Sequence, residues 1–387
     1  AEFRKRIFTM KIAQKTIKFL TIATIALFTT VSFAAESDKK HDDQNDGGRV
    51  NTKSEVKDYI QHHLKDSHDF TLFSYTGDDN KRHHFGTSLP VILWSSEGLV
   101  TFMSSEFHHN DDGHVIVEKN GLKFAKIHSK IYELDKGAST ATFDEDHHAT
   151  NAHKVLDFSI TKSVVGILLV GLLMLFWFSR LAKQYKTRKV PTGFGRILEP
   201  LVLYVRDEIA RPNIGDKHYR KFTGYLLTVF FFIWILNLFG LTPIGFNVTG
   251  QIAVTACLAI FTLVVYTFSA NKQYWGHVLW MPGIPVFVKP ILAIIEVAGH
   301  FLIKPFSLLV RLFANITAGH VVLMSLIAIM FTLKKELGIV GATGLSFALS
   351  FLIILIEVLV AFLQAYIFTM LSALFIGMAV EEHDDHH

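Results

Sequence analysis

Cysteine is nearly absent from this chain of 387 residues, which contains Cys257 alone. A disulfide needs two thiols and a cysteine metal centre needs several, so a single chain can form neither. Cys257 stands in an apolar stretch, where a small buried residue is the ordinary interpretation. The sequence also lacks a G-x-x-x-x-G-K-[ST] phosphate loop, which excludes this class of nucleotide site.

Charge is scarce in one part of the chain. Half of all residues are apolar, and few charged residues occur between residues 222 and 380, whereas the first half is rich in them. The net charge of +4 is small and dispersed. The sequence has no basic stripe with interleaved aromatics, so it does not predict nucleic acid as a partner. This distribution indicates an integral membrane protein with a polar appendage.

The amino terminus is typical of a secretory signal. From Met10, the chain has a basic start, an apolar core "LTIATIALFTTV" and a small-residue cleavage site near Ala34 or Ala35. The nine residues before Met10 look like an over-extended gene start or an expression remnant. We therefore expect residues 1–35 to be leader and signal peptide, and the residues that follow to be exported.

The exported segment divides into two parts. Residues 36–54 carry too little apolar content to pack, which predicts a disordered linker. Residues 55–153 combine one helical pattern with several β-type runs, and Asn120-Gly121 is a strong hairpin signal. Thirteen of the 20 histidines fall in the exported segment, but adjacent pairs point to opposite faces of a strand and predict a solvated surface more than a metal site. We expect a small β-rich extension of unknown role.

Apolar runs dominate from residue 159 onward. A first span ends at the basic cluster "RLAKQYKTRKV", which the positive-inside rule places in the cytoplasm. Residues 194–220 fit a helix lying on the cytoplasmic face, and further spans are expected at about 222–243 and 251–270. Two runs, 286–333 and 343–380, are too long for one perpendicular crossing and predict strong tilt or a partly in-plane course.

The predicted fold is therefore an all-α polytopic membrane protein with about five membrane-embedded segments, the last two forming a long tilted helical hairpin. The membrane domain covers residues 154–380, and residues 381–387 form a polar cytoplasmic tail. The small β-rich exported extension precedes it.

Arg311 lies inside one of the long apolar runs, "KPFSLLVRLFANITAGH". Its guanidinium cannot neutralise by losing a proton, and a buried arginine costs about 2.5–3.5 kcal/mol even on the insertion scale. At 100° per residue, His300, Arg311 and Asn315 share one helix face, with Glu296 modestly displaced and His320 about 180° away.

Glu357 and Gln364 are seven residues apart in the next run and share a face. A lone membrane histidine or glutamine is often only a hydrogen-bond partner worth under about 2 kcal/mol. Two carboxylates, two histidines and an arginine in adjoining segments exceed what packing needs, and such a constellation suits ion or proton passage. Two other classes stay open: a secondary transporter with an intramembrane Arg/Glu/His site, which would ordinarily show internal repeats, and an anchored periplasmic binding module.

These residues resemble subunit a of the rotary F-type ATP synthase. The likeness rests on "KPFSLLVRLFANITAGH", "IEVLVAFLQAYIFTMLSALFIGMA", "NLFGLTP" and "PLVLYVRDEIARPNIG", and it covers residues 155–380. It implies a non-catalytic stator that conducts protons through two half-channels to a ring of c subunits. The extension is much longer than the core family needs, and the resemblance says nothing of its role.

The resemblance also implies roles for single residues. Arg311 would face ring carboxylates of another chain, and Asn315 and Gln364 would hydrogen-bond beside it. His320 and Glu357 would relay protons; family members often carry the two residue types exchanged, so one acid and one imidazole are retained. Glu296 and His300 would belong to the other half-channel. Glu208 matches a cytoplasmic-side acid of the family, although a surface charge is nearly as good an interpretation.

The implied partners are the subunit c ring, the subunit b peripheral stalk, other F-type subunits, the lipid bilayer and protons. No cofactor, metal or catalytic residue is expected in this chain, because nucleotide chemistry would reside on other subunits. The expected location is a bacterial inner membrane, with multiple spans, a periplasmic extension and a cytoplasmic carboxyl terminus.

Overall fold

A computed structural model describes most of the chain after the predicted signal and linker. It covers residues 66–76, 82–108, 110–127, 129–135, 138, 142, 150–187, 191–242, 247–280 and 285–381. Within these ranges, side chains are not described at residues 71–76, 82–85, 112, 187, 320, 324, 327–336 and 339. The predicted signal peptide, the linker 36–54 and residues 382–387 of the predicted tail lie outside the described residues.

The described part of the extension consists of antiparallel strands in three small sheets. In these sheets, β1 (Asp69–Thr76) pairs with β2 (Arg82–Ser88), β3 (Pro90–Ser95) lies between β4 (Gly98–Met103) and β9 (Leu156–Asp157), and β5 (Asp112–Lys119), β6 (Leu122–Ile127), β7 (Lys130–Leu134) and β8 (Ala152–Lys154) follow in order. The strands therefore run to Asp157, past the boundary at residue 153 expected from sequence.

The residues at the turns and the alternation of buried and outward-facing side chains explain these strands. Asn120 and Gly121 both have a positive φ, as a two-residue hairpin turn requires, and Lys119 pairs with Leu122 across it. In β3, Val91 and Leu93 are fully buried. A core of such side chains, with Phe107 and Phe124 at its centre, holds the extension together.

The extension is joined tightly to the first membrane helix, α3 (Lys162–Thr187). Asp66 accepts hydrogen bonds through Oδ1 from the Ser163 N–H at 3.1 Å and the Ser163 hydroxyl at 2.9 Å. The Lys162 N–H donates to the Ser67 carbonyl at 2.9 Å. Asp66 therefore satisfies otherwise free donors at the start of α3, and it fixes the extension to the helix.

Five helical segments within the described ranges are long and apolar enough to cross a membrane. They are Lys162–Lys186, Tyr219–Gly240, Ile252–Ser269, Lys289–Leu323 and Val340–Val380. This confirms the prediction of a mostly helical polytopic membrane protein with about five spans, and the second and third spans agree with the sequence to within a few residues. Cys257 in the third span is exposed, so the expectation of a buried cysteine was wrong.

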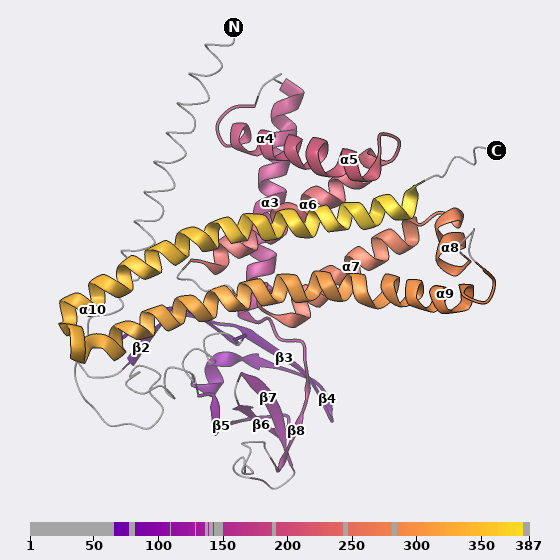
Figure 1. Cartoon of the computed structure of the whole chain (residues 1–387). Helices are drawn as coiled ribbons and strands as arrows, with labels where there is room; N and C mark the ends of the chain where they lie inside the picture. Colours follow the sequence, from indigo (N-terminus) through magenta and orange to yellow (C-terminus); the bar gives the residue numbers. More distant parts are fainter. Residues whose placement is uncertain are drawn as a thin grey trace.

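The first three spans alternate in direction. The Lys162 end of α3 meets the extension, and its other end meets α4 (Gly195–Tyr204), as Figure 1 shows. A π-helical stretch (Val205–Ala210) and α5 (Arg211–Ile214) complete the short helical layer there. From this layer α6 (Tyr219–Gly240) returns toward the extension, and α7 (Ile252–Ser269) leads away again.

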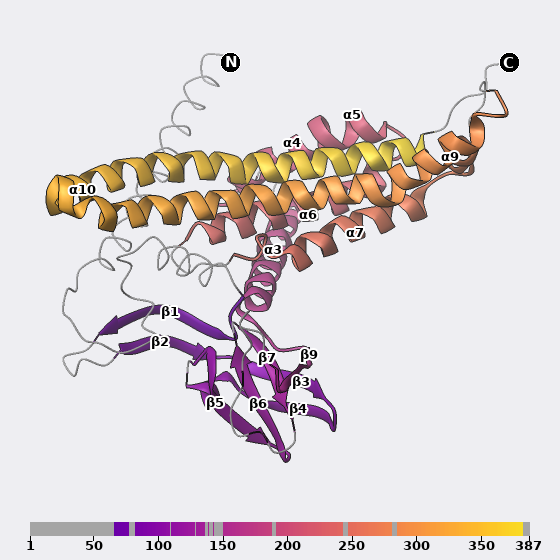
Figure 2. The same ribbon diagram turned by 60° about the horizontal axis from the view of Figure 1, so that its bottom comes forward.

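The last two spans form a hairpin. Three segments join end to end in helical conformation: α9 (Lys289–Ala298), a π-helical stretch (Gly299–Ile303) and α10 (Lys304–Val380). Gly338, with φ of 69° and ψ of 170°, interrupts α10, so residues 289–337 form a first arm and residues 339–380 a second. Figures 1 and 2 show the two arms of α10 side by side, with α3 crossing them.

The carboxyl end of the second arm packs against the short helices. Asn271, just before α8 (Lys272–Leu279), donates from its backbone N–H to the Ala379 carbonyl at 2.9 Å. Gly377 approaches α5 so closely that a Cβ there would collide with the Asn213 carbonyl. Buried side chains of α3, α6, α7 and the second arm share one core, so these elements hold the hairpin in place.

Candidate functional site

Arg311 lies in the first arm, at the boundary between buried and exposed side chains. Leu308 and Leu312 are buried in the helical core, while Val310 and Ala314 are exposed. Arg311 itself is partly exposed and has no hydrogen bond or ion pair with a described residue. A cation that remains charged at any biological pH is thus presented at the edge of the hairpin.

One helical turn later, the two arms are connected by a polar pair. Asn315 Nδ2 donates to Gln364 Oε1 at 2.7 Å. Gln364 is only 1% exposed, and its Nε2 finds no acceptor among the described residues. Because Asn315 follows Arg311 by four residues, the guanidinium and this amide pair share one face of the first arm. The bond fixes the register of the arms beside Arg311.

His300 is the centre of a second polar group. Its ring is 1% exposed, with Nε2 at 2.9 Å from Thr267 Oγ1 and Nδ1 at 2.7 Å from the Tyr274 hydroxyl. The Tyr266 hydroxyl donates to the His300 carbonyl at 2.6 Å. Lys304 Nζ donates to the Tyr274 hydroxyl at 3.4 Å, so an amine also belongs to this hydrogen-bonded group.

Glu296 lies in the same neighbourhood. Burial raises the pKa of the Tyr274 hydroxyl, and the Glu296 carboxylate raises it further. The group at this end of the hairpin therefore contains an acid, an imidazole, a phenol and an amine. We call it the distal group: Thr267, Tyr274, Glu296, His300 and Lys304.

Glu357 belongs to a third polar group on the other side of Arg311. It lines a small cavity with Asn237 and Thr249. Thr249 Oγ1 donates to Asn237 Oδ1 at 2.8 Å, and Asn237 Nδ2 has no partner among the described residues. A Cβ at Gly319 would collide with the Glu357 carboxylate in its present position, so the carboxylate lies directly against the first arm at this glycine. We call Asn237, Thr249, Gly319 and Glu357 the proximal group.

The two groups lie toward opposite ends of the spans. The proximal group uses Asn237 near the end of α6 and Thr249 just before α7, where the chain has returned toward the extension. The distal group uses Thr267 near the opposite end of α7. Along the first arm, His300 and Gly319 stand roughly 16 Å and 12 Å on either side of Arg311 at 1.5 Å per residue. Arg311 is thus flanked by two separate polar groups.

The structure separates residues that helix-face counting put on one stripe. The π-helical stretch Gly299–Ile303 breaks the rule of 100° per residue between His300 and Arg311. His300 consequently contacts α7 and the segment after it, whereas Asn315 contacts the second arm. The side chain of His320 is outside the described residues; its neighbour Gly319 abuts Glu357. Glu208 is exposed, as a surface charge would be.

Sequence reasoning missed several polar partners. The side chains of Asn237, Thr249, Thr267 and Tyr274 complete the two groups, yet each belongs to another span or a connecting segment. Asn237 in "NLFGLTP" was the one available signal, as a polar residue ending an apolar run. Within the described ranges, no three His, Cys, Asp or Glu side chains are placed to hold a metal ion.

Comparison with known proteins identifies the family of the membrane part. Residues 164–377 match the family described as "ATP synthase A chain". The chain belongs to the ATP synthase A chain family. It is 43% identical over 245 residues to "ATP synthase subunit a 2" of Chlorobaculum tepidum, covering 59% of this chain and 66% of that protein. The resemblance to the F-type subunit a is confirmed.

Other relatives of this subunit a homologue give the same result. "ATP synthase subunit a 2" of Prosthecochloris aestuarii is 42% identical over 269 residues, covering 65% of this chain and 78% of that protein. "ATP synthase subunit a" of Myxococcus xanthus is 43% identical over 240 residues, covering 60% of this chain and 77% of that protein. Residues 59–158 match a different family, "Domain of unknown function (DUF8433)". The subunit a homologue therefore carries a second family domain before its membrane part.

Proposed function

We propose that this chain is the proton-conducting stator of an F-type ATP synthase, coupling proton passage through two half-channels to rotation of a ring of c subunits. The observation that carries the proposal is the placement of Arg311, which lies without an ion-pair partner among the described residues and between two polar groups directed to opposite ends of the spans. Membership in the ATP synthase A chain family supports it.

An acceptor from another chain would complete the arginine site. The Arg311 guanidinium is partly exposed and has no partner among the described residues, and a carboxylate on another chain can accept its hydrogen bonds. Ser307, Ala314 and Ala318 form an exposed row of small residues beside Arg311, which lets another helix approach closely. A ring helix that carries an acidic side chain has the matching chemistry.

Charge control explains how such a contact could produce rotation. A protonated ring carboxyl is neutral and can turn through lipid, whereas the ionised form is held where Arg311 offers the opposite charge. Arg311 also repels a bare proton that would pass directly from one polar group to the other. Each proton crossing 100 mV releases about 2.3 kcal/mol, so several crossings must be accumulated by rotation.

The two polar groups supply the two half-channels in this proposal. The proximal group, with Glu357 and the adjoining His320, opens toward the side of the extension, and the distal group, with Glu296 and His300, opens toward the opposite side. We further propose a bacterial inner membrane location, a periplasmic extension and a cytoplasmic carboxyl terminus. The basic cluster after α3 and the signal-like amino terminus support this orientation. The proposed partners are the c ring, the subunit b stalk and the remaining F-type subunits.

Proton pumping driven by ATP in membrane vesicles tests the proposal. The substitution Arg311→Ala is expected to abolish pumping, while ATP hydrolysis by the detached soluble sector continues. The same vesicles, energised by another route, should report whether the variant leaks protons.

Arg220→Ala is the matched control, because Arg220 is an exposed arginine at the start of α6 that bonds only its neighbour Tyr219 among the described residues. The control should pump normally. Normal pumping by Arg311→Ala in a fully assembled complex would overturn the proposal, and so would solute uptake by the chain alone.

A further inference from the structure

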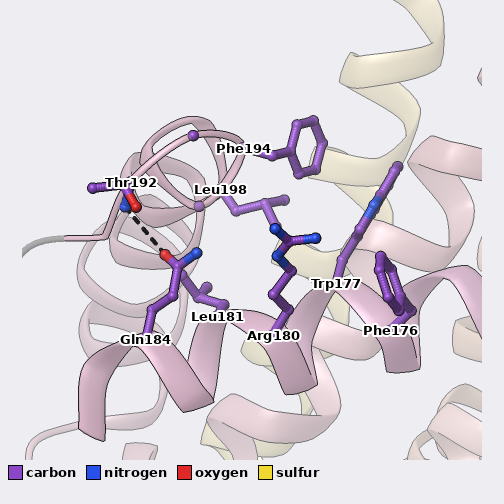
Figure 3. A pocket seen from close by; sticks show the side chains of 10 residues that line it. Phe176, Trp177, Arg180, Leu181, Gln184, Thr192, Phe194 and Leu198 are labelled. Atoms are coloured by element: carbon purple, nitrogen blue, oxygen red, sulfur yellow. Dashed lines mark hydrogen bonds between the residues drawn. The ribbon is translucent and has the colours of Figure 1, made fainter. Parts of the chain in front are cut away.

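A pocket of about 270 Å³ lies where the last turns of α3 meet the segment before α4 and the first turn of α4. Figure 3 shows Arg180 rising into it between the rings of Trp177 and Phe194 and the side chain of Leu198. Phe176 forms a further part of the wall. The pocket is remote from the proton path proposed above, and none of those polar residues lines it.

The segment that closes this pocket is held in a defined conformation. The Thr192 N–H donates to Gln184 Oε1 at 3.1 Å, and Gly193 has a positive φ, which favours glycine. A Cβ at Gly195 would lie 2.9 Å from Gln184 Oε1 and 3.1 Å from Leu181 Cδ1, so glycine is needed for close contact with α3. The pocket is therefore a built feature of the fold.

Arg180 brings a positive charge into an apolar wall. It has no hydrogen bond or ion pair with any described residue. The carboxylate of Glu199 on α4 is engaged elsewhere, since it accepts from the Tyr185 hydroxyl at 2.6 Å. A guanidinium whose five donors lack partners in the described part of the chain suits an anion with several acceptor oxygens, of which a phosphate is the commonest.

The position of the pocket identifies the source of that phosphate. Arg180 lies eighteen residues after Lys162, or roughly 27 Å along α3, which is close to the thickness of the hydrocarbon core. The rings of Trp177 and Phe194 lie 4.5 Å apart between centroids, and tryptophan is enriched at headgroup level. Basic pockets beside membrane helices bind anionic headgroups. We propose that this pocket binds the phosphate headgroup of an anionic phospholipid.

The shape and charge favour a lipid over other occupants. The volume accommodates a phosphodiester and its glycerol but not an entire lipid, so the acyl chains would continue over the exposed face of α3 at Phe176 and Leu172. Free phosphate would make no use of the aromatic wall. Lys183 and Lys186 add positive charge at the same level of α3, which further favours an anionic over a zwitterionic headgroup.

Photolabelling of the purified ATP synthase complex in nanodiscs tests the site. The probe is phosphatidylglycerol with a diazirine close to its glycerol, and the readout is mass spectrometry of the peptide that contains residues 176–198. Excess phosphatidylglycerol should compete the label away, whereas phosphatidylcholine and inorganic phosphate should not. Arg180→Gln should reduce labelling by about tenfold or more, because it removes direct charge-assisted hydrogen bonds in the pocket as well as the long-range charge.

Lys183→Gln is the matched control, because it removes the same charge from the same end of α3 without lining the pocket. Because Lys183 contributes only long-range charge, its labelling should fall by no more than about fivefold, clearly less than in Arg180→Gln. Should Arg180→Gln fail to assemble, Arg180→Lys and the competition series on wild type decide the question, with partial labelling expected for the lysine. Equal losses in both glutamine variants, equal competition by phosphatidylcholine, displacement by inorganic phosphate, or occupation of the pocket by a helix of another subunit would each overturn the proposal.

Discussion

Charged side chains have different surroundings in the extension and in the membrane hairpin. In the extension, Lys126 is nearly buried, and its Nζ lies 3.0 Å from Asp69 Oδ2 and 4.0 Å from Asp111 Oδ1. The Ser104 hydroxyl donates to Asp69 Oδ1 at 2.6 Å. These charges are satisfied within the chain. In the hairpin, Arg311 has no such partner among the described residues.

The difference separates a structural charge from one directed at another molecule. A buried ion pair whose remaining lone pairs accept hydrogen bonds keeps its own region folded, and removing one partner is costly. An unpaired arginine in a membrane segment is costly as it stands, and it is retained where a counter-charge arrives from outside. The chain therefore contains a charge network whose members pair with one another and, at Arg311, a charge with no partner among the described residues.

The largest effect that would sharpen this contrast is expected from Lys126→Met. It leaves the Asp69 carboxylate buried without its cation, which costs about 3–5 kcal/mol of local stability. Amide hydrogen exchange in β1, β5 and β6 should accelerate accordingly, while ATP-driven proton pumping stays normal. Lys130→Met, at an exposed position of β7, should leave the exchange pattern unchanged.

The double variant Lys126→Met/Asp69→Leu provides a second check on the same pair. Because both charges are gone, it should recover a large part of the lost protection. Equal exchange in wild type and Lys126→Met would show that the network is not structural, and the contrast between the two regions would fail.

A smaller effect is expected from Asn315→Ala in the hairpin. This change leaves the buried Gln364 Oε1 without its donor at 2.7 Å, a penalty of about 1–3 kcal/mol. If the amide pair positions the second arm beside Arg311, proton pumping should fall about tenfold, as about 1.4 kcal/mol corresponds to one decade. Quenching of a pH dye in vesicles measures it.

Ser325→Ala is the control for that experiment. The Ser325 hydroxyl donates to the Val321 carbonyl of its own helix at 2.7 Å, so its loss removes a bond within the first arm and none between the arms among the described residues. A similar decrease in both variants would attribute the effect to general polarity of the arm.

The spans and the hairpin turn at Asn120-Gly121 were predictable because they depend on local signals. Apolar length sets a membrane helix, and the Asn-Gly pair permits the positive φ that the turn requires. The strands beyond residue 153 were not predicted. Leu156 and Asp157 pair with β3 only through contacts distant in sequence.

The polar groups were predictable in part. Helix-face counting located the charged residues but failed across the π-helical stretch Gly299–Ile303. Both π-helical stretches end two residues before a proline, Pro305 or Pro212, which has no backbone N–H to donate and whose ring clashes with the carbonyl four residues earlier. Proline was thus the missed signal. Tyr274 and Thr267 could not be assigned, because their contacts with His300 are tertiary.

Gly319→Ala tests whether the Glu357 carboxylate of the proximal group serves proton passage, in contrast to the structural charges of the extension. The new Cβ meets the flexible end of Glu357, so the carboxylate moves aside at a cost below about 1.5 kcal/mol and the fold persists. If Glu357 conducts protons, pumping should fall by about threefold to tenfold with normal assembly. Gly344→Ala is the control, since a Cβ there meets nothing within 4 Å. Unchanged pumping in both variants would remove Glu357 from the proposed path.

The smallest effect concerns pH and a second pair in the extension. His68 is 3% exposed and its Nε2 lies 2.7 Å from Asp157 Oδ2. Burial alone would raise the pKa of Asp157, but hydrogen bonds from His68 and Ser159 bring it below the ordinary value of 3.8. A carboxyl group with a lowered pKa stabilises the fold fully above its unfolded pKa, and the contribution disappears as pH falls below about 4.

This pair can be compared directly with an exposed one. His153 Nε2 and Asp135 Oδ1 lie 3.1 Å apart, and because both side chains are exposed to solvent, their attraction is worth little. Asp157→Asn should lower hydrogen-exchange protection of β3 and β9 at pH 7 by about 1 kcal/mol and flatten its decline between about pH 5 and pH 3, after correction for intrinsic exchange rates. Asp135→Asn should retain the wild-type decline. If the two variants behave alike, burial does not distinguish the His68–Asp157 pair from the exposed His153–Asp135 pair.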